Sequence, residues 1–140
     1  MRSKVILDAG PWVAYLLRDD AYHNWAVEQF GQFDEFVTCE PVVAEVCARL
    51  AYHQVDPGKA LEFLEDGSVV LAYGLGKEVG QVIRLMAKYR DQGMDLADAC
   101  VVRMTEIQRW SQVMTVDRDF RVYRRFGRET IETIHPDWSE

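Results

Sequence analysis

Short apolar runs alternate with longer amphipathic segments along most of this sequence. Runs rich in β-branched and aromatic residues, bounded by turn residues, are typical of buried strands. Four such runs cover residues 4–7, 36–39, 68–73 and 112–116. A further strand is predicted near residues 130–134, after the turn at Gly127.

The segments between these runs have apolar residues at helical spacing. Pro11 and Pro41 suit the first turns of helices, and Gly31 and Gly67 follow predicted helix ends. The predicted helices cover residues 12–17, 21–30, 42–54, 59–66, 77–90, 95–110 and 118–126. Strands and helices therefore alternate through the whole chain.

This alternation predicts the α/β class, as a three-layer α/β/α fold with a central parallel sheet of four to five strands. The length of 140 residues is typical of one domain, so residues 1–140 are predicted to form a single domain. Ligand sites in such sheets lie beyond the carboxyl ends of the strands. Asp8 and Asp117 directly follow the first and fourth predicted strands.

The composition is that of an ordinary globular protein, with 49% hydrophobic and 28% charged residues. The longest apolar runs fall far short of the roughly 20 residues of a membrane span. The N-terminal segment lacks the apolar core of a signal peptide, so we expect a cytoplasmic protein without membrane contact. Cys39, Cys47 and Cys100 show no metal-ligand spacing and are predicted to be free thiols.

The net charge of −7 argues at first against a nucleic-acid partner. The charges are unevenly distributed, however. Residues 1–70 hold 5 basic and 12 acidic side chains, whereas residues 71–140 hold 11 of each. A nucleic-acid enzyme that concentrates acids in a metal pocket fits this pattern, because bound cations offset part of the charge.

Two isolated acids in apolar surroundings are candidate ligands. Asp8 ends an apolar run, where an Asp commonly serves as a helix cap or turn residue. Glu45 lies between Ala44 and Val46 in an apolar helix, where an ionised carboxylate is costly unless it is paired or binds a metal. An ion pair with Arg49, one turn later, is the alternative for Glu45.

Two further pairs of acids follow predicted helix and strand boundaries. Asp95 and Asp98 have the spacing of a capping box, but Asp98 is also surrounded by small and apolar residues. Asp119 is predicted to cap the helix at 118–126, which leaves Asp117 for a site. Carboxylates gathered without His or Cys favour Mg²⁺ or Mn²⁺ over zinc.

The segment 118–128 combines arginines with aromatic residues. Its arginines, of which Arg118, Arg121 and Arg124 are the candidates for RNA binding, suit contacts with phosphates, and the aromatic residues suit base stacking. The alternative is a helix whose aromatic face is buried and whose arginines face water. Both interpretations are compatible with the spacing.

Four motifs in this order, LDAGPWVAYL, VVAEV, MDLADACVV and TVDRDF, resemble those of the PIN-domain family, in particular its toxin ribonucleases of the VapC type. The resemblance runs from about residue 4 to residue 134. It implies a metal-dependent ribonuclease in which Asp8, Glu45, Asp98 and Asp117 hold Mg²⁺ or Mn²⁺, with Asp95 and Asp119 as accessory acids. Ala9 departs from the family pattern, in which a Thr or Ser often follows the first Asp.

The resemblance also implies partners: an RNA substrate, a small antitoxin protein and a second copy of the chain in a homodimer. Aromatic residues of the first two helices are placed either at such an interface or in the core; they are Trp12, Tyr15, Tyr22 and Trp25. Two other functions are weighed against a ribonuclease. One is a PIN-like module that binds RNA or protein without catalysis, and the other is a phosphatase with an aspartate pocket, which the D-A-G ending of the first strand disfavours.

Overall fold

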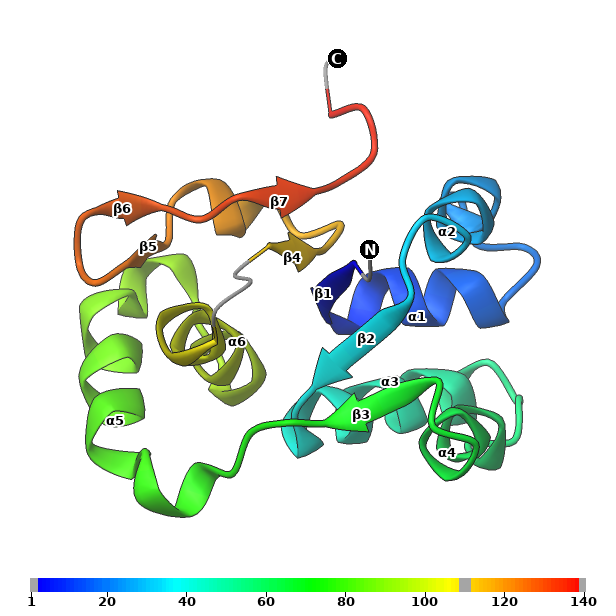
Figure 1. Ribbon diagram of the computed structural model, residues 1–140, viewed down its shortest axis with the longest axis horizontal. Coiled ribbons are helices and arrows are strands. Elements are labelled where there is room, and N and C mark those ends of the chain that lie inside the picture. Colours follow the sequence, from blue (N-terminus) through cyan, green and yellow to red (C-terminus); the bar gives the residue numbers. More distant parts are fainter. Residues whose placement is uncertain (1–2, 109–111, 139–140) are drawn as a thin grey trace.

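The centre of the molecule is a five-stranded parallel sheet with the strand order β3-β2-β1-β4-β7 (Figure 1). The computed structural model describes residues 3–108 and 112–138. The strands of the sheet are β1 (Lys4–Leu7), β2 (Glu35–Thr38), β3 (Val69–Leu71), β4 (Val113–Met114) and β7 (Thr133–Ile134). The predicted α/β class with a central parallel sheet is therefore confirmed.

Six α-helices flank the sheet: α1 (Ala9–Leu16), α2 (His23–Phe30), α3 (Glu40–Tyr52), α4 (Gly58–Glu65), α5 (Val79–Lys88) and α6 (Leu96–Ile107). Short 3₁₀ turns are η1 (Leu75–Lys77), η2 (Arg90–Gln92) and η3 (Arg118–Arg121). Figure 1 shows α1 to α4 on one side of the strands and α5 with α6 on the other. Residues 109 and 110, the last two of the helix predicted at 95–110, lie outside the described residues. Within those residues, no helix is both long and apolar enough to cross a membrane.

Strand β1 occupies the middle of the sheet. It pairs with β2 through Val5 and Phe36, and with β4 through Ile6 and Val113. Val5, Ile6 and Leu7 are fully buried, and each such side chain contributes about 1.5–3 kcal/mol when it leaves water. The apolar run thus fixes the strand, and the acid that follows it is held at the carboxyl edge of the sheet.

Strand β3 differs from its prediction because it lies at an edge of the sheet. Among the described strands it pairs with β2 alone. Val69 is buried, but Val70 and Leu71 are 46% and 42% exposed. The prediction of a fully buried strand at 68–73 is therefore wrong, because an apolar run does not distinguish an edge strand from a central one.

The predicted helix at 118–126 is also wrong. The chain forms η3 and then β5 (Arg124–Arg125), which pairs antiparallel with β6 (Glu129–Thr130). Phe126 has a left-handed backbone with φ of 54°, and a right-handed helix cannot continue through such a residue. The predicted strand at 130–134 is consequently divided between β6 in this hairpin and β7 in the main sheet.

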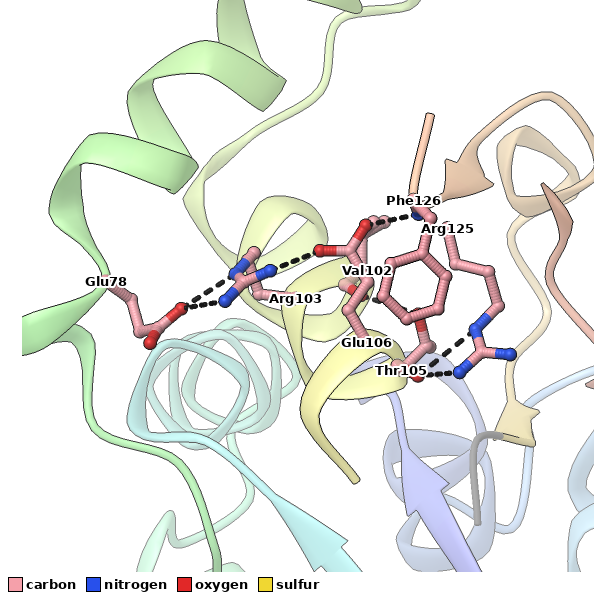
Figure 2. Close-up of polar contacts among 7 residues, drawn as sticks. All are labelled: Glu78, Val102, Arg103, Thr105, Glu106, Arg125 and Phe126. Atoms are coloured by element: carbon pink, nitrogen blue, oxygen red, sulfur yellow. Dashed lines mark hydrogen bonds and ion pairs between the residues drawn. The ribbon is translucent and has the colours of Figure 1, made fainter. Parts of the chain in front are cut away.

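The β5–β6 hairpin is held against the C-terminal end of α6 (Figure 2). Arg103 donates to Glu78 and to Glu106, at 2.7 and 2.5 Å. The second carboxylate oxygen of Glu106 accepts from the backbone N–H of Phe126 at 2.6 Å. The Arg125 guanidinium donates to the carbonyl of Thr105. These charge-assisted bonds stabilise the strained backbone of Phe126.

The aromatic residues of α1 pack against other aromatic rings. Trp12 is fully buried against Phe63, with ring centroids 6.1 Å apart, and Tyr15 stacks on Phe30 at 4.4 Å. Trp25 packs against the same core. Tyr22 is half-buried at the start of α2. The core alternative therefore holds for Trp12, and Trp25 packs against the core, whereas Tyr15 and Tyr22 are half-buried.

Candidate active site

A pocket of about 350 Å³ lies where β1 and β4 end. It is lined by Asp8, Gly10, Glu45, Arg49, Gly93, Asp95, Asp98, Val116, Asp117 and Asp119. Six of these ten residues are acids, and they are the same six that the sequence patterns single out. We call this hollow the acid pocket. Segments far apart in the chain meet there because the parallel strands end at one edge of the sheet.

Asp8 is the most buried acid of the pocket, with 6% of its surface exposed. Its backbone N–H donates to Met114 at 3.0 Å, which continues the pairing of β1 with β4. Its Oδ2 accepts a 2.7 Å hydrogen bond from the Thr115 hydroxyl. Burial raises the pKa of Asp8 to about 6, although the hydrogen bond from Thr115 acts in the opposite direction.

Asp117 follows β4 and is attached to the same hydroxyl. Its backbone N–H donates to Thr115 Oγ1 at 2.9 Å, and its Oδ1 accepts from the N–H of Asp119 at 2.9 Å. Asp117, and not Asp119, is therefore the cap of η3, so the predicted capping role of Asp119 is wrong. Burial raises the pKa of Asp117.

Asp95 and Asp98 form the predicted capping box at the start of α6. The N–H of Asp98 donates to Asp95 Oδ1 at 2.8 Å, and the N–H of Asp95 donates to Asp98 Oδ2 at 3.2 Å. Asp98 also lines the pocket, so the capping role and a place in the pocket coexist. Burial, and then the charges of Asp95 and Asp8, raise the pKa of Asp98 to about 8.

Glu45 reaches the pocket from α3, where it also pairs with Arg49 at 3.7 Å. The ion pair with Arg49 is thus confirmed, and Glu45 lines the pocket at the same time. Burial and the charge of Asp95 raise the pKa of Glu45, whereas Arg49 lowers it. Arg49 is the only basic residue among those described as lining the pocket, and it offsets part of the negative charge.

The carboxylates of the pocket fit a hard divalent cation by their chemistry. Four of them have raised pKa values, which shows that their negative charges are poorly solvated and repel one another. None of the described residues that line the pocket is a His or Cys, so the donor set favours Mg²⁺ or Mn²⁺ over zinc. In the described part of the chain, no three acidic, His or Cys side chains are already arranged around a metal position.

Gly10 allows α1 to begin close to the end of β4. A Cβ atom on this residue would lie 2.3 Å from Val116 Cγ2, far inside van der Waals contact. Both residues line the acid pocket. The absence of a side chain at position 10 therefore sets how near the segments after β1 and β4 approach each other.

The three arginines expected to bind RNA have different surroundings. Nη1 of Arg124 donates to the carbonyls of Arg121, Val122 and Tyr123, so its guanidinium supports the backbone of the turn. Arg118 and Arg121 are exposed on η3, directly after Asp117. The Arg121 guanidinium lies 5.6 Å from the ring centre of Trp138.

Two residues near the acids were not singled out by the sequence patterns. Gly93 lines the pocket and has a φ of 73°, a backbone conformation that favours glycine. The only sequence signal for this residue is a Gly shortly before a predicted helix. Tyr123 donates to Asp98 from 25 positions away, and no local pattern reveals such a contact.

The fold and this pocket define a three-layer α/β protein with a carboxylate-lined site at the carboxyl edge of its sheet. The sequence matches the family model of the PIN domain over residues 5–125. The chain therefore belongs to the PIN domain family. A comparison with the curated proteins gave no match.

A solved structure of similar fold is that of VapC20 from Mycobacterium tuberculosis, described as a Sarcin-Ricin loop cleaving toxin. The two structures superpose with a TM-score of 0.71 at 18% sequence identity. The match covers 82% of this chain and 91% of VapC20. At this identity the likeness establishes a shared fold.

Proposed function

We propose that this protein is a Mg²⁺- or Mn²⁺-dependent endoribonuclease that hydrolyses phosphodiester bonds of RNA. The observation that carries the proposal is the gathering of Asp8, Glu45, Asp98 and Asp117 around one pocket of a PIN domain. Their raised pKa values mark carboxylates that a cation would stabilise. Asp95 and Asp119 line the same pocket as accessory acids.

In this proposal the four acids hold the cation and the chain provides no side-chain nucleophile. A bound divalent cation supplies a water of lowered pKa and neutralises charge on the scissile phosphate. Asp8 is held by Thr115, and Asp98 by the start of α6, so both carboxylates are oriented before a cation binds. In this proposal the exposed Arg118 and Arg121 contact phosphates, whereas Arg124 donates to backbone carbonyls at the end of η3.

We further propose that the protein is the toxin of a type II toxin–antitoxin pair and acts in the cytoplasm. The fold likeness to VapC20, described as a toxin, supports this assignment. The partners in this proposal are an RNA substrate and a small antitoxin, with the toxin forming a homodimer. The exposed apolar side chains Ile83 and Val79 on α5 are available for a protein contact.

The test is cleavage of labelled structured and single-stranded RNAs by the purified protein with Mn²⁺ and with EDTA. Asp8→Asn removes the most buried acid, and Glu62→Gln, an exposed carboxylate on α4, is the matched control. We expect Mn²⁺-dependent cleavage that Asp8→Asn abolishes and Glu62→Gln retains.

Cleavage that persists in EDTA, or in a pure Asp8→Asn protein, would contradict the proposed site. A protein that binds RNA without cutting it, and shows no Mn²⁺-dependent thermal shift, is instead a non-catalytic PIN module. A measurement of metal binding that does not depend on cleavage therefore distinguishes the ribonuclease from the non-catalytic module.

A further inference from the structure

Tyr123 is a fully buried residue whose hydroxyl contacts Asp98, one of the acids that line the acid pocket. Its ring packs edge-on against Phe120 and Tyr89, with ring centroids 5.1 Å apart in both pairs. Its Oη donates to Asp98 Oδ2 at 3.2 Å, which is longer than the usual range of about 2.5–3.0 Å for hydroxyl–oxygen hydrogen bonds. The aromatic packing fixes the ring, and the ring fixes where the hydroxyl points.

The carboxylate of Asp98 is held on one side only. The two hydrogen bonds that the structure shows to it, from the Asp95 N–H and the Tyr123 hydroxyl, both end on Oδ2. Within the described residues, Oδ1 accepts from neither of them. Asp98 lines the acid pocket, so Oδ1 is the oxygen that remains for a ligand there.

We propose that Tyr123 is a positioning residue for Asp98: its phenol holds Oδ2, so that Asp98 presents the single oxygen Oδ1 to a divalent cation in the acid pocket. The inference rests on the proposed function and adds a residue that acts on the metal through a ligand. Outer hydrogen-bond partners of this kind orient metal ligands and tune their affinity.

The neighbouring Tyr89 shows what a purely structural phenol does in the same cluster. Tyr89 is also buried, and its hydroxyl accepts a 3.0 Å hydrogen bond from the backbone N–H of Arg124. The two phenols share an aromatic contact, but only that of Tyr123 contacts an acid of the pocket. A Phe at either position would keep the packing and remove one hydroxyl.

The experiment therefore compares Tyr123→Phe with Tyr89→Phe. Mn²⁺ affinity is measured by calorimetric titration of the metal-free protein, and folding by thermal unfolding. We expect Tyr123→Phe to bind Mn²⁺ about 10- to 100-fold more weakly, the usual cost of losing an outer-shell partner. Tyr89→Phe should keep the wild-type affinity even if its unfolding temperature falls.

Replacement of Tyr123 by 4-aminophenylalanine retains a hydrogen-bond donor at the same place in the ring. We expect this variant to recover most of the Mn²⁺ affinity that Tyr123→Phe loses. It also carries the test if Tyr123→Phe does not fold: affinity near the wild type then supports the inference, and affinity as low as that of Asp98→Asn contradicts it.

Three outcomes would overturn the role of Tyr123. Unchanged Mn²⁺ affinity in folded Tyr123→Phe, together with loss of affinity in Asp8→Asn, removes the role and leaves the proposed metal site standing. Equal weakening in Tyr123→Phe and Tyr89→Phe assigns the effect to the general loss of a buried hydroxyl in this cluster, and not to the contact with Asp98. Wild-type protein that binds no Mn²⁺ contradicts both the role of Tyr123 and the proposed function.

Discussion

Thr115 and Asp8 lie 107 positions apart, yet the Thr115 hydroxyl donates a 2.7 Å hydrogen bond to the Asp8 carboxylate. The same hydroxyl accepts the backbone N–H of Asp117 at 2.9 Å. One side chain thus connects the first and the fourth acid of the pocket. Thr115 is itself fully buried, so this connection is shielded from water.

Thr115→Val keeps the shape of the side chain and removes this hydroxyl. We expect Mn²⁺ affinity to fall about 10- to 100-fold and stability to fall by about 1–3 kcal/mol, because Asp8 loses its donor in a buried place. Thr105→Val is the matched control, since Thr105 is also fully buried but donates to Val102 within α6. Equal loss of Mn²⁺ affinity in both variants would show that the hydroxyl of Thr115 has no special role.

The stability of the metal-free protein should fall as the pH rises. Burial raises the pKa of Asp8 from 3.8 to about 6, so the folded state holds a proton that the unfolded state has already lost. Each pKa unit corresponds to about 1.4 kcal/mol, which makes the loss about 3 kcal/mol from Asp8 between about pH 4 and pH 6. The raised pKa of Asp98 extends the decline toward pH 8.

Thermal unfolding in EDTA and in Mn²⁺ across this pH range checks this linkage. We expect unfolding temperatures in EDTA to decrease above about pH 5, and Mn²⁺ to restore them near pH 8 by binding the ionised carboxylates. Asp8→Asn should flatten the part of the curve below pH 6. A stability that rises with pH in EDTA contradicts the raised pKa values.

Gly10→Ala should destabilise the fold although alanine favours helices. The added methyl group would lie 2.3 Å from Val116 Cγ2, so α1 or the segment after β4 has to move. Overpacking of this kind costs about 1–3 kcal/mol. Gly74→Ala, where no atom lies within 4 Å of the added Cβ, is the matched control for urea unfolding. A Gly10→Ala protein as stable as the control would show that the packing between residue 10 and Val116 leaves room for a methyl group.

Arg49→Met should separate metal binding from substrate binding. Arg49 is the basic side chain of the acid pocket and pairs with Glu45 at 3.7 Å. Removing it should raise Mn²⁺ affinity by up to about fivefold, since an exposed ion pair is worth up to about 1 kcal/mol. RNA binding should weaken at the same time, because a phosphate loses a cation near the pocket. Weaker Mn²⁺ binding in this variant would contradict the competition between Arg49 and the metal.

Arg121→Ala and Arg124→Ala should have different effects. Arg121 is exposed on η3, so its loss should weaken RNA binding and lower the salt dependence by about one counterion. Nη1 of Arg124 donates to three backbone carbonyls, so its loss should mainly lower the unfolding temperature. RNA titrations at several salt concentrations, with thermal unfolding of both variants, distinguish the two roles.

The sequence was sufficient for the parts of the fold that depend on local pattern. Lys4–Leu7 is a strand because its apolar residues are buried by helices on both faces. In α6, the helical spacing of the apolar residues is evident from residues 96–107. The pattern was not sufficient after Asp117. There the conformation includes a hydrogen bond that the Phe126 N–H donates to the Glu106 carboxylate, 20 positions away. Local propensity favoured a helix, and this tertiary contact stabilises a turn instead.

Most of these acids could be found from the sequence because they follow a strand or begin a helix, whereas Glu45 stands out as a carboxylate inside an apolar helix. The order of the strands then determines that Asp8 and Asp117 meet, since β1 and β4 are neighbours. The capping of η3 by Asp117 and not by Asp119 could not be foreseen, because either acid satisfies the spacing of a cap. The contact of Tyr123 with Asp98 depends on aromatic packing, which has no signature in spacing.

The strand order also determines when the acid pocket can form during synthesis. Strand β1 is made first, but it lies between β2 and β4, and β4 follows more than a hundred residues later. A nascent chain that has reached α5 holds Asp8 and Glu45, yet it lacks Asp98, Thr115 and Asp117. The ribosome therefore carries an incomplete pocket until synthesis has passed β4. An enzyme that cuts RNA would in this way gain its activity only after the codons for β4 and Asp117 have been read.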